Sequence, residues 1–358
     1  MVPSTVEPAD RLSQETADTG GSDTGSRGEP TPSTGNRVTK LGGVEGFRKH
    51  LETTGVSKRV SAMVVEKWKG SSRNTYESGW KGWNSWCSAR DIDPHTPSEA
   101  MVAEYLLEKF DEGLSYDHIG VIRSAISAFA RGPEGTPIGQ CTLIKGLMKG
   151  FYNKRTPRPR YTATWSIDTL LEFWKGQPVD RDLDLKDLTI KVTSLLAVSH
   201  LTRASDLNLM LAENHKREEG FLEFLLESTP KHQRKGLLEP LTVYKVSVNK
   251  IDPVSCLIEY LDRTQEFRLL EDGITRSKLF LSYVGRHKPV TTTTISNWIK
   301  LAMDKAGIDT STYRAHSTRS AGVSSAFHLR NVSIKAIMRR GKWSNSSILK
   351  KYYLRRLR

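Results

Sequence analysis

The sequence predicts a mainly α-helical protein with a small antiparallel β-sheet, an α+β chain with two structured domains. Its 358 residues correspond to about two domains at roughly 150 residues each. Apolar side chains recur at helical spacing between residues 44 and 154. Beyond residue 162, helical patterns alternate with two short runs of β-type residues. We therefore expect an all-helical domain followed by a mixed one.

Residues 1–43 differ in composition from everything that follows. They are rich in Ser, Thr, Gly, Pro and acidic residues and hold almost no large apolar side chain. Such a segment buries too little surface to offset the entropy cost of ordering it. We expect a disordered tail.

An aromatic stripe marks the centre of the first domain, residues 44–154. Tyr76, Trp80, Trp83 and Cys87 follow one another at helical spacing. Because buried aromatic side chains dominate core energetics, the stripe indicates core packing rather than a ligand platform.

Further helices of this domain follow the stripe. T-P-S-E at residues 96–99 is a helix-start signal, and apolar side chains then follow one face as far as Phe110. Similar patterns predict helices over about 115–130 and 143–152. We expect four or five helices in this domain.

A basic segment, residues 155–161, joins the two domains. Its two prolines favour an extended backbone. An ordinary linker and a strap lying against phosphates both fit, and we favour the strap because little nearby would otherwise neutralise its charge. With the last residue of the preceding helix, the positive side chains are Lys154, Arg155, Arg158 and Arg160.

The second domain, residues 162–358, has mixed patterns. Helices are expected over 166–175, 188–199 and 294–306. The runs F-L-E-F-L-L-E-S-T and L-T-V-Y-K-V-S-V predict two strands, and K-H-Q-R-K-G between them predicts a turn with Gly236.

The charge of the chain indicates the class of partner. The net charge is +14, and the first 38 residues hold three basic and six acidic side chains, so the remaining 320 carry +17. A basic body of this size indicates a polyanionic partner, most often nucleic acid. No apolar run approaches the ~20 residues of a membrane helix. Three widely spaced cysteines predict neither a disulfide framework nor a zinc ribbon.

Several familiar enzyme motifs are absent from the sequence. There is no P-loop, no G-x-S-x-G, no H-E-x-x-H and no EF-hand loop. Acidic pairs such as Asp182/Asp184 lie in polar, turn-like surroundings, so no carboxylate cluster for two-metal chemistry is predicted.

The most informative residues lie in the second domain. His316 and Arg319 are three residues apart in Y-R-A-H-S-T-R-S-A-G, so both can reach one anionic group from the start of a helix. Trp343 precedes Tyr352 by nine residues, and Arg203 follows an apolar helix. Residues 331–358 also contain nine Lys or Arg and no acidic residue.

The order Arg203, Lys231, His316-x-x-Arg319, Trp343 and Tyr352 resembles the catalytic pattern of the tyrosine recombinase (phage integrase) family. Lys231 lies in the predicted turn, and Asp206, three residues after Arg203, matches an acidic position of the family. The resemblance covers about residues 44–358. It implies a helical, SAM-like core-binding domain over 44–154 and a catalytic domain over 162–358. Within the family, the set looks most like recombinases of eukaryotic mobile elements, such as the DIRS and Crypton types.

The resemblance also implies a role for each residue. Tyr352 would attack phosphorus and form a 3′-phosphotyrosine, while Arg203 and Arg319 bind the non-bridging oxygens. Lys231 would protonate the leaving 5′-oxygen. His316 would assist proton transfer at the tyrosine or donate a hydrogen bond to the phosphate. Trp343 stands where most family members have a histidine, and its indole N–H can donate one hydrogen bond. Asp206 would orient a neighbouring catalytic side chain.

Two of these assignments have a neighbouring alternative. Lys235 competes with Lys231 for the turn position, and Tyr353 competes with Tyr352 as the nucleophile. Adjacent residues point about 100° apart on a helix, so only one tyrosine can face the site. The nine-residue spacing favours Tyr352, and the end of the first β-type run favours Lys231.

We therefore expect a site-specific recombinase or integrase that grips duplex DNA between its two domains, as a homo-tetramer on paired sites. The C-terminal Lys350 and Lys351 are expected to touch DNA. No metal and no nucleotide cofactor are implied. The nucleus is the expected location, from the DNA substrate and the eukaryotic resemblance.

Three further expectations qualify this interpretation. A type IB topoisomerase-like relaxing activity and a catalytically inactive, domesticated DNA-binding remnant of a mobile element are the alternatives. Many family members continue past the tyrosine with a helix that docks on a neighbouring protomer. Only six residues follow Tyr352, so docking of that kind is not favoured, or the gene product is truncated.

Overall fold

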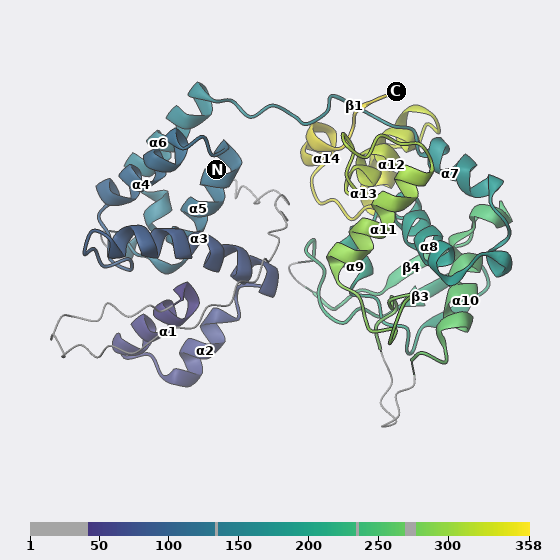
Figure 1. The fold of residues 1–358 in the computed structure, drawn as a ribbon, viewed down its shortest axis with the longest axis horizontal. Helices are drawn as coiled ribbons and strands as arrows, with labels where there is room; N and C mark the ends of the chain where they lie inside the picture. The colour runs from purple at the N-terminus through teal and green to yellow at the C-terminus, as the bar shows by residue number, and fades with distance from the viewer. Residues whose placement is uncertain (1–41, 133–134, 234–235, 269–276) are drawn as a thin grey trace, which may run out of the picture. The chain divides into compact units, whose positions relative to one another are not determined.

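The computed structural model describes residues 42–132, 135–233, 236–268 and 277–358. The expected tail falls almost entirely outside these residues. The chain divides into two compact units, with the boundary after Arg158, inside the basic segment predicted to join the domains (Figure 1). No helix in the described part of the chain is long and apolar enough to cross a membrane.

The described residues of the first unit form helices and connecting loops, with one isolated bridge between Arg131 and Pro137. Several helices begin at a serine whose side chain accepts a backbone N–H, as Ser98 does from Met101. The described helices of this unit are α1 (Gly43–Thr53), α2 (Lys58–Val65), α3 (Gly70–Ser88), α4 (Glu99–Asp111), α5 (Tyr116–Phe129), the short 3₁₀ helix η2 (Ile138–Gln140) and α6 (Thr142–Lys154).

The aromatic stripe of α3 is confirmed as core. Trp80 and Trp83 are 1% and 0% exposed, and Trp83 Nε1 donates to the carbonyl of Pro94 at 3.0 Å. Phe129 of α5 packs edge-on against Trp80. The described residues of this unit form six α-helices rather than four or five, because the 11-residue α1 and the 8-residue α2 precede the stripe from which the helices were counted.

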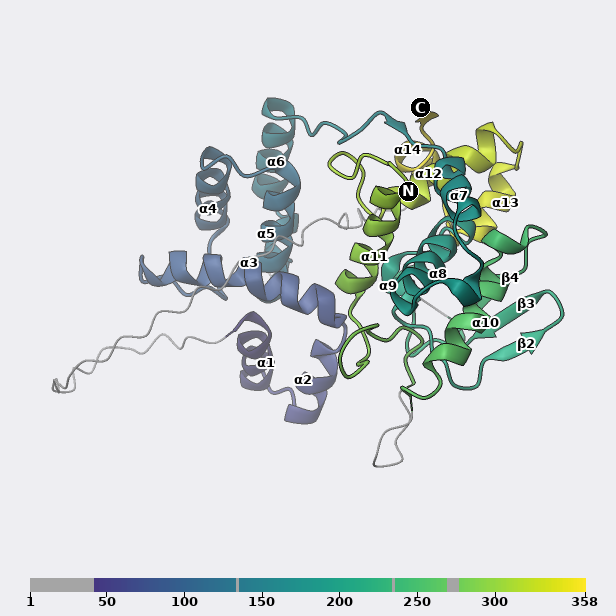
Figure 2. The ribbon, with the colours of Figure 1, turned by 45° about the vertical axis from the view of Figure 1, so that its right-hand side comes forward.

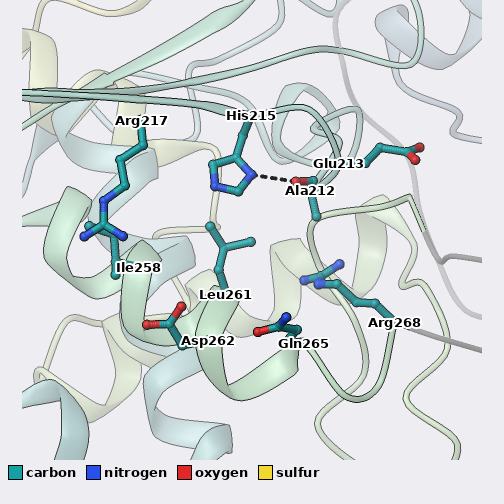
Figure 3. A pocket seen from close by; sticks show the side chains of 9 residues that line it. All are labelled: Ala212, Glu213, His215, Arg217, Ile258, Leu261, Asp262, Gln265 and Arg268. Atoms are coloured by element: carbon teal, nitrogen blue, oxygen red, sulfur yellow. Dashed lines mark hydrogen bonds between the residues drawn. The ribbon is translucent and has the colours of Figure 1, made fainter.

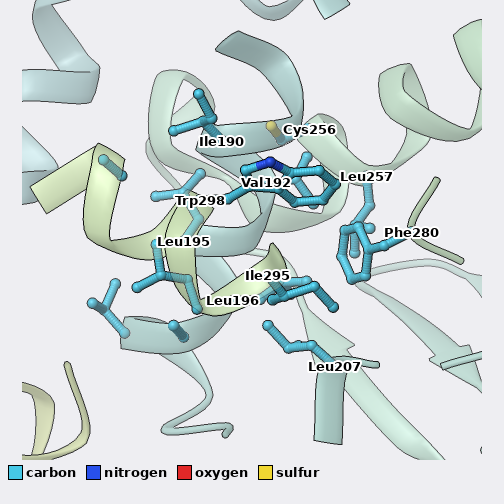
Figure 4. Close-up of a cluster of buried hydrophobic side chains, with 14 of the residues drawn as sticks. Ile190, Val192, Leu195, Leu196, Leu207, Cys256, Leu257, Phe280, Ile295 and Trp298 are labelled. Atoms are coloured by element: carbon cyan, nitrogen blue, oxygen red, sulfur yellow. The ribbon is translucent and has the colours of Figure 1, made fainter. Parts of the chain in front are cut away.

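The second unit is built around α8 (Leu185–Ser199), whose residues 188–198 are all buried. Its neighbours α10, α11 and α12 pack around it, and Figure 4 shows Leu195, Leu257 and Trp298 meeting in this core. The predicted helices at 166–175, 188–199 and 294–306 are confirmed within a few residues. The helices other than α8 are α7 (Ile167–Gly176), α9 (Ala204–Leu207), α10 (Pro253–Thr264), α11 (Thr292–Lys305), α12 (Ser317–His328), α13 (Ile334–Arg340), α14 (Ser346–Tyr352) and the 3₁₀ helices η3 (Asp180–Asp182) and η4 (Asn249–Ile251).

A small antiparallel sheet of order β2-β3-β4 lies in the second unit (Figure 2). β3 (Phe221–Phe224) pairs with β4 (Leu241–Tyr244), which confirms the two predicted strands. The first strand, β2 (Lys216–Glu218), is fully exposed and polar, so it carries no hydrophobic signal. A separate parallel pair joins β1 (Ala163–Thr164) to β5 (Arg356–Leu357).

A second, smaller apolar cluster holds the C-terminal helices together. Leu201, Val323, Ile337 and Leu349 are buried in it. They come from the loop after α8 and from α12, α13 and α14, the elements that carry most of the predicted site residues. This cluster therefore brings distant stretches of sequence to one place.

Candidate active site

Arg203 and Asp206 lie at the start of α9. The Arg203 side chain is 18% exposed, and its Nη1 lies 3.8 Å from Asp206 Oδ2. The same carboxylate oxygen accepts the Arg203 backbone N–H at 3.3 Å. Asp206, itself buried, therefore holds both the backbone and the guanidinium of Arg203.

Arg319 is a buried charge on α12, only 1% exposed. Its Nη1 donates to the carbonyl of Leu201, and its Nη2 donates to the carbonyl of Gly341 at 3.1 Å. Burial and the nearby Arg203 guanidinium lower the pKa of Arg319 to about 10. Arg319 therefore still carries its charge at neutral pH, near the guanidinium of Arg203.

The carbonyl that Arg319 binds belongs to a strained residue. Leu201 has φ of 53°, a left-handed conformation that costs a β- or γ-branched residue about 1–3 kcal/mol. The Arg319 hydrogen bond and the burial of the Leu201 side chain hold this conformation in place. The Arg319 guanidinium therefore stabilises the turn between α8 and α9, and the Leu201 carbonyl of that turn in return fixes the position of the guanidinium.

Trp343 and Tyr353 complete one wall around Arg319. The Arg319 guanidinium carbon lies 4.1 Å from the centroid of the Trp343 ring and 5.4 Å from that of Tyr353. The two rings meet edge to face, with centroids 4.9 Å apart. The Tyr353 hydroxyl lies 3.4 Å from His316 Nε2. Ser320, on α12, donates its hydroxyl to the Tyr353 carbonyl at 2.7 Å and so fixes this residue.

Tyr352 occupies a different environment from Tyr353. It is the last residue of α14, is 55% exposed, and has the Lys351 ammonium 5.2 Å from its ring centroid. Successive helical residues diverge by about 100°, so turning one tyrosine inward turns the other out. The structure brings Tyr353 to Arg319 and His316, and it does not bring Tyr352, the residue that the spacing favours.

The turn after β3 offers two candidate proton donors. Lys231 is exposed, whereas both ring nitrogens of the adjacent His232 are buried and have no hydrogen-bond partner among the described residues. Burial lowers the pKa of His232, and Asp206, Arg203 and Arg319 are among the charges that it senses. Lys235, the alternative to Lys231, lies outside the described residues. His232 was not selected from the sequence, where its only signal is its place in the same turn.

The buried nitrogen atoms around Arg319 share one property. Several have no hydrogen-bond partner among the described residues: Arg203 Nη1, Arg319 Nε, Trp343 Nε1 and both nitrogens of His232. A buried polar group without a partner costs about 1–3 kcal/mol, and such groups are few in native proteins. An anion with several acceptor oxygens could accept hydrogen bonds from several of these groups at once.

The predicted DNA strap is partly used within the protein. Lys154 ends α6, and Arg158 is exposed. Arg155 donates to the carbonyls of Leu114 and Phe110 within the first unit. Arg160 donates to the carbonyls of Thr312 and Ser311 within the second unit. Lys350 and Lys351 are exposed on α14, as a contact with DNA would require.

Three observations concern other kinds of site in the described part of the chain. A cavity of about 280 Å³ between His215 and Arg268 is lined by acidic and basic side chains alike, and it shares no residue with the Arg203–Arg319 cluster (Figure 3). Within the described ranges, no group of three or more His, Cys, Asp or Glu is placed to hold a metal ion. Cys87, Cys141 and Cys256 are all buried and unbridged.

Comparisons with known proteins bear on the fold. No protein-family model matches the chain, and no curated protein sequence matches it. Among solved structures, the site-specific recombinase XerH, in a post-cleavage complex with its palindromic difH substrate, matches at a TM-score of 0.51 and 16% identity, over 85% of this chain and 80% of that chain. The fold resembles that of a tyrosine recombinase. The predicted fold class, mainly helical with a small antiparallel sheet, is confirmed.

Two further solved structures resemble the chain less closely. A lambda integrase dimer (residues 75–356) bound to a COC′ core site matches at a TM-score of 0.46 and 16% identity, over 86% of this chain and 95% of that chain. The Tn1549 transposon integrase (residues 82–397), in complex with circular intermediate DNA, matches at 0.46 and 15% identity, over 88% and 95%.

Proposed function

We propose that the protein is a site-specific DNA recombinase that cleaves and rejoins strands through a covalent 3′-phosphotyrosine, without a metal ion. The observation that carries this proposal is the set of unpartnered buried nitrogens around Arg203 and Arg319. The non-bridging oxygens of a phosphodiester supply the acceptors that these groups lack. Their charge would grow in the transition state, where two guanidiniums stabilise it most.

The residues of this site can supply the nucleophile, the base and the acid that the cleavage step needs. The tyrosine oxygen attacks phosphorus and the bond from phosphorus to the 5′-oxygen breaks. The tyrosine proton passes to His316 Nε2, which lies 3.4 Å from the Tyr353 hydroxyl. The leaving 5′-oxygen takes a proton from Lys231 or His232. Rejoining is the same step reversed, with a 5′-hydroxyl as the nucleophile.

The geometry favours Tyr353 as the nucleophile, although the sequence spacing favours Tyr352. A nucleophile should lie within reach of a base and beside the groups that bind the phosphate. Tyr353 meets both conditions through His316 and Arg319. An exposed Tyr352 could meet them only if α14 turned about its axis.

A nicked suicide substrate tests the function and the nucleophile together. Cleavage near the nick releases a short strand, so the covalent adduct accumulates and is seen on a denaturing gel. Wild type, Tyr352→Phe and Tyr353→Phe would be compared on mixed-sequence DNA without divalent metal. We expect an adduct that only Tyr353→Phe abolishes. Loss in Tyr352→Phe alone would restore the nine-residue spacing as the correct guide. No adduct despite tight DNA binding would point to a non-catalytic binding protein.

The finer parts of the proposal rest on the sequence resemblance. They are a tetramer as the working form on paired DNA sites, an origin in a eukaryotic mobile element, and action in the nucleus. XerH is seen with its DNA substrate after cleavage, which supports duplex DNA as the substrate class here. A one-plasmid relaxation assay separates recombination from a topoisomerase-like activity, since only the latter needs no partner site.

A further inference from the structure

A second cationic site lies in the helical unit and shares no residue with the groups used above. A cavity of about 360 Å³ opens between the end of α2, the α3 and α5 helices and the segment around η2. Its cations are Lys67, Arg123 and Arg131, and no carboxylate is among the described residues that line it. The cavity lies wholly within the first unit.

The three cations have no counter-charge in the part of the chain that the structure describes. None of their side chains forms a salt bridge or hydrogen bond there, whereas Arg48 and Arg90 of the same unit each pair with a glutamate. Burial, together with the charge of Arg131, lowers the pKa of Lys67. Gathering like charges costs free energy unless an anion joins them.

The aromatic walls of the cavity are already occupied. The Lys67 ammonium lies 4.2 Å from the ring centroid of Trp68 and 4.8 Å from that of Phe47. Trp68 also packs edge-on against Phe129. Ring faces covered in this way do not serve as platforms for stacking a base. The cavity therefore offers charge and hydroxyl groups rather than an aromatic stack.

One hydroxyl of the cavity, that of Ser127, is placed to donate, whereas Ser124 Oγ already donates to the Gly120 carbonyl at 2.8 Å. Ser127 Oγ accepts the Gly139 backbone N–H at 3.2 Å, which leaves its own hydrogen for another acceptor. A side chain at Gly139 would meet Ser127 Cβ at 3.0 Å, so glycine permits this close approach. Three cations and the Ser127 hydroxyl, with no acid among the described lining residues, suit an acceptor-only anion.

We propose that this cavity binds a phosphate group of the DNA backbone, as an anchor separate from the reacting phosphate. The inference rests on the proposed function for its source of phosphate. The same chemistry would accept a free polyphosphate, so the experiment must separate the two sources. In either case the ligand is a phosphate oxyanion held by Lys67, Arg123 and Arg131.

DNA affinity is the first measurement, made with the full chain on a fluorescent mixed-sequence duplex at fixed salt. Arg123→Gln and Arg131→Gln should each weaken binding about tenfold, the value of one charge-assisted hydrogen bond. The matched control is Lys81→Gln, an exposed cation of α3 outside the cavity, which should change binding less than twofold. The double variant should lose less than the product of the singles, because both groups serve one phosphate. Lys67→Gln, at an exposed position, serves if an arginine variant fails to fold.

Three outcomes decide the matter. Equal losses in the cavity variants and the control would overturn the proposal, since only general charge would then matter. If tripolyphosphate changes the Trp fluorescence of wild type but not of Arg131→Gln, while DNA affinity is equal in both, the source is a free polyphosphate and the DNA anchor is wrong. If wild type forms no covalent adduct but the cavity variants still weaken binding selectively, the proposed function fails and the anchor stands.

Discussion

At the scale of single residues, the proton donor to the leaving 5′-oxygen is the sharpest open choice. Lys231 is exposed, while both ring nitrogens of His232 are buried, sense the charges of Arg203 and Arg319, and have no hydrogen-bond partner within the described ranges. A phosphate brought to this site would raise the pKa of His232, since it adds negative charge beside the ring. We predict that His232 can donate the proton once DNA is bound.

A substrate with sulfur in place of the bridging 5′-oxygen measures this directly. A thiolate leaves without help, since thiol pKa values are near ~8.5, so loss of the true acid costs nothing on that substrate. We expect His232→Ala to slow cleavage of the oxygen substrate by about 10²–10⁴-fold. On the sulfur substrate, the same variant should cleave at the wild-type rate. Lys231→Ala is the matched variant. Restoration of Lys231→Ala alone would assign the acid to Lys231.

Gly341 is a second residue whose role can be tested singly. Its carbonyl accepts from Arg319, and a Cβ there would meet Cζ3 of Trp343 at 1.9 Å. Gly341→Ala should push the indole off Arg319, destabilise the protein by about 1–3 kcal/mol, and reduce adduct formation. Gly146→Ala is the control, because nothing lies within 4 Å of that position. Thermal unfolding would measure the loss of stability, and the denaturing gel would measure the loss of covalent adduct. An unchanged rate of adduct formation in Gly341→Ala would show that Trp343 has no part in the mechanism.

At the scale of secondary-structure elements, His200 connects the end of α8 with β4 and α13. Its Nε2 accepts from the Tyr244 backbone N–H of β4 at 3.2 Å and from Arg340 Nη2 of α13 at 3.0 Å. Its Nδ1 faces Ser199 Oγ at 2.7 Å. Burial and the charge of Arg340 lower the pKa of His200 well below 6.5. The ring is therefore neutral in the folded protein, and protonation would put an N–H against a guanidinium.

This arrangement predicts a pH dependence of stability. Below pH 6.5 the unfolded chain binds a proton at His200 that the folded chain does not. The free energy of unfolding should therefore fall as the pH falls below 6.5, by up to about 1.4 kcal/mol per pH unit from this group. Above that pH, His200 adds no dependence. Denaturant unfolding of wild type and His200→Gln between pH 5 and 8 would measure it, and equal slopes in both would exclude His200.

Elements with a strong apolar period were predictable from the sequence, and short polar ones were not. The helices α3, α4, α5, α7, α8 and α11 each carry a buried face that the spacing reveals. β2 is exposed and polar, and β1 and β5 hold two residues each, so neither the pattern nor the length signals a strand.

The candidate site shows the same limit of sequence reasoning. Order and spacing selected Arg203, Arg319 and His316, of which the structure places Arg319 and His316 beside Tyr353 and Arg203 near Arg319. Spacing alone could not choose between Tyr352 and Tyr353, because the choice depends on where α14 ends and how it is rotated. The same holds for Lys231 and His232, whose directions depend on the conformation of a turn.

At the scale of the whole molecule, charge and two separate cores determine the behaviour. Each unit has its own buried cluster, and residues 39–358 carry the +17 excess. If ~6–10 phosphates are contacted, DNA affinity should fall about 10³–10⁵-fold between 50 and 200 mM salt. Anisotropy titrations at several salt concentrations test this, and a shallow dependence would contradict binding mainly through the backbone.

The position of the boundary between the units gives a last prediction. A fragment of residues 42–154 ends with the predicted helical domain, whereas a fragment of residues 42–158 also contains Arg155. The Arg155 guanidinium donates to the carbonyls of Leu114 and Phe110, and its carbon lies 4.1 Å from the Phe110 ring centroid. These contacts tie α6 to the loop between α4 and α5. Both fragments should fold, since their core is complete, but the longer one should be about 1–2 kcal/mol more stable. Its melting temperature should be higher by roughly 4–8 °C. Arg155→Gln in the longer fragment should remove the difference, and if it does not, Arg155 is free to serve DNA as the basic segment predicts.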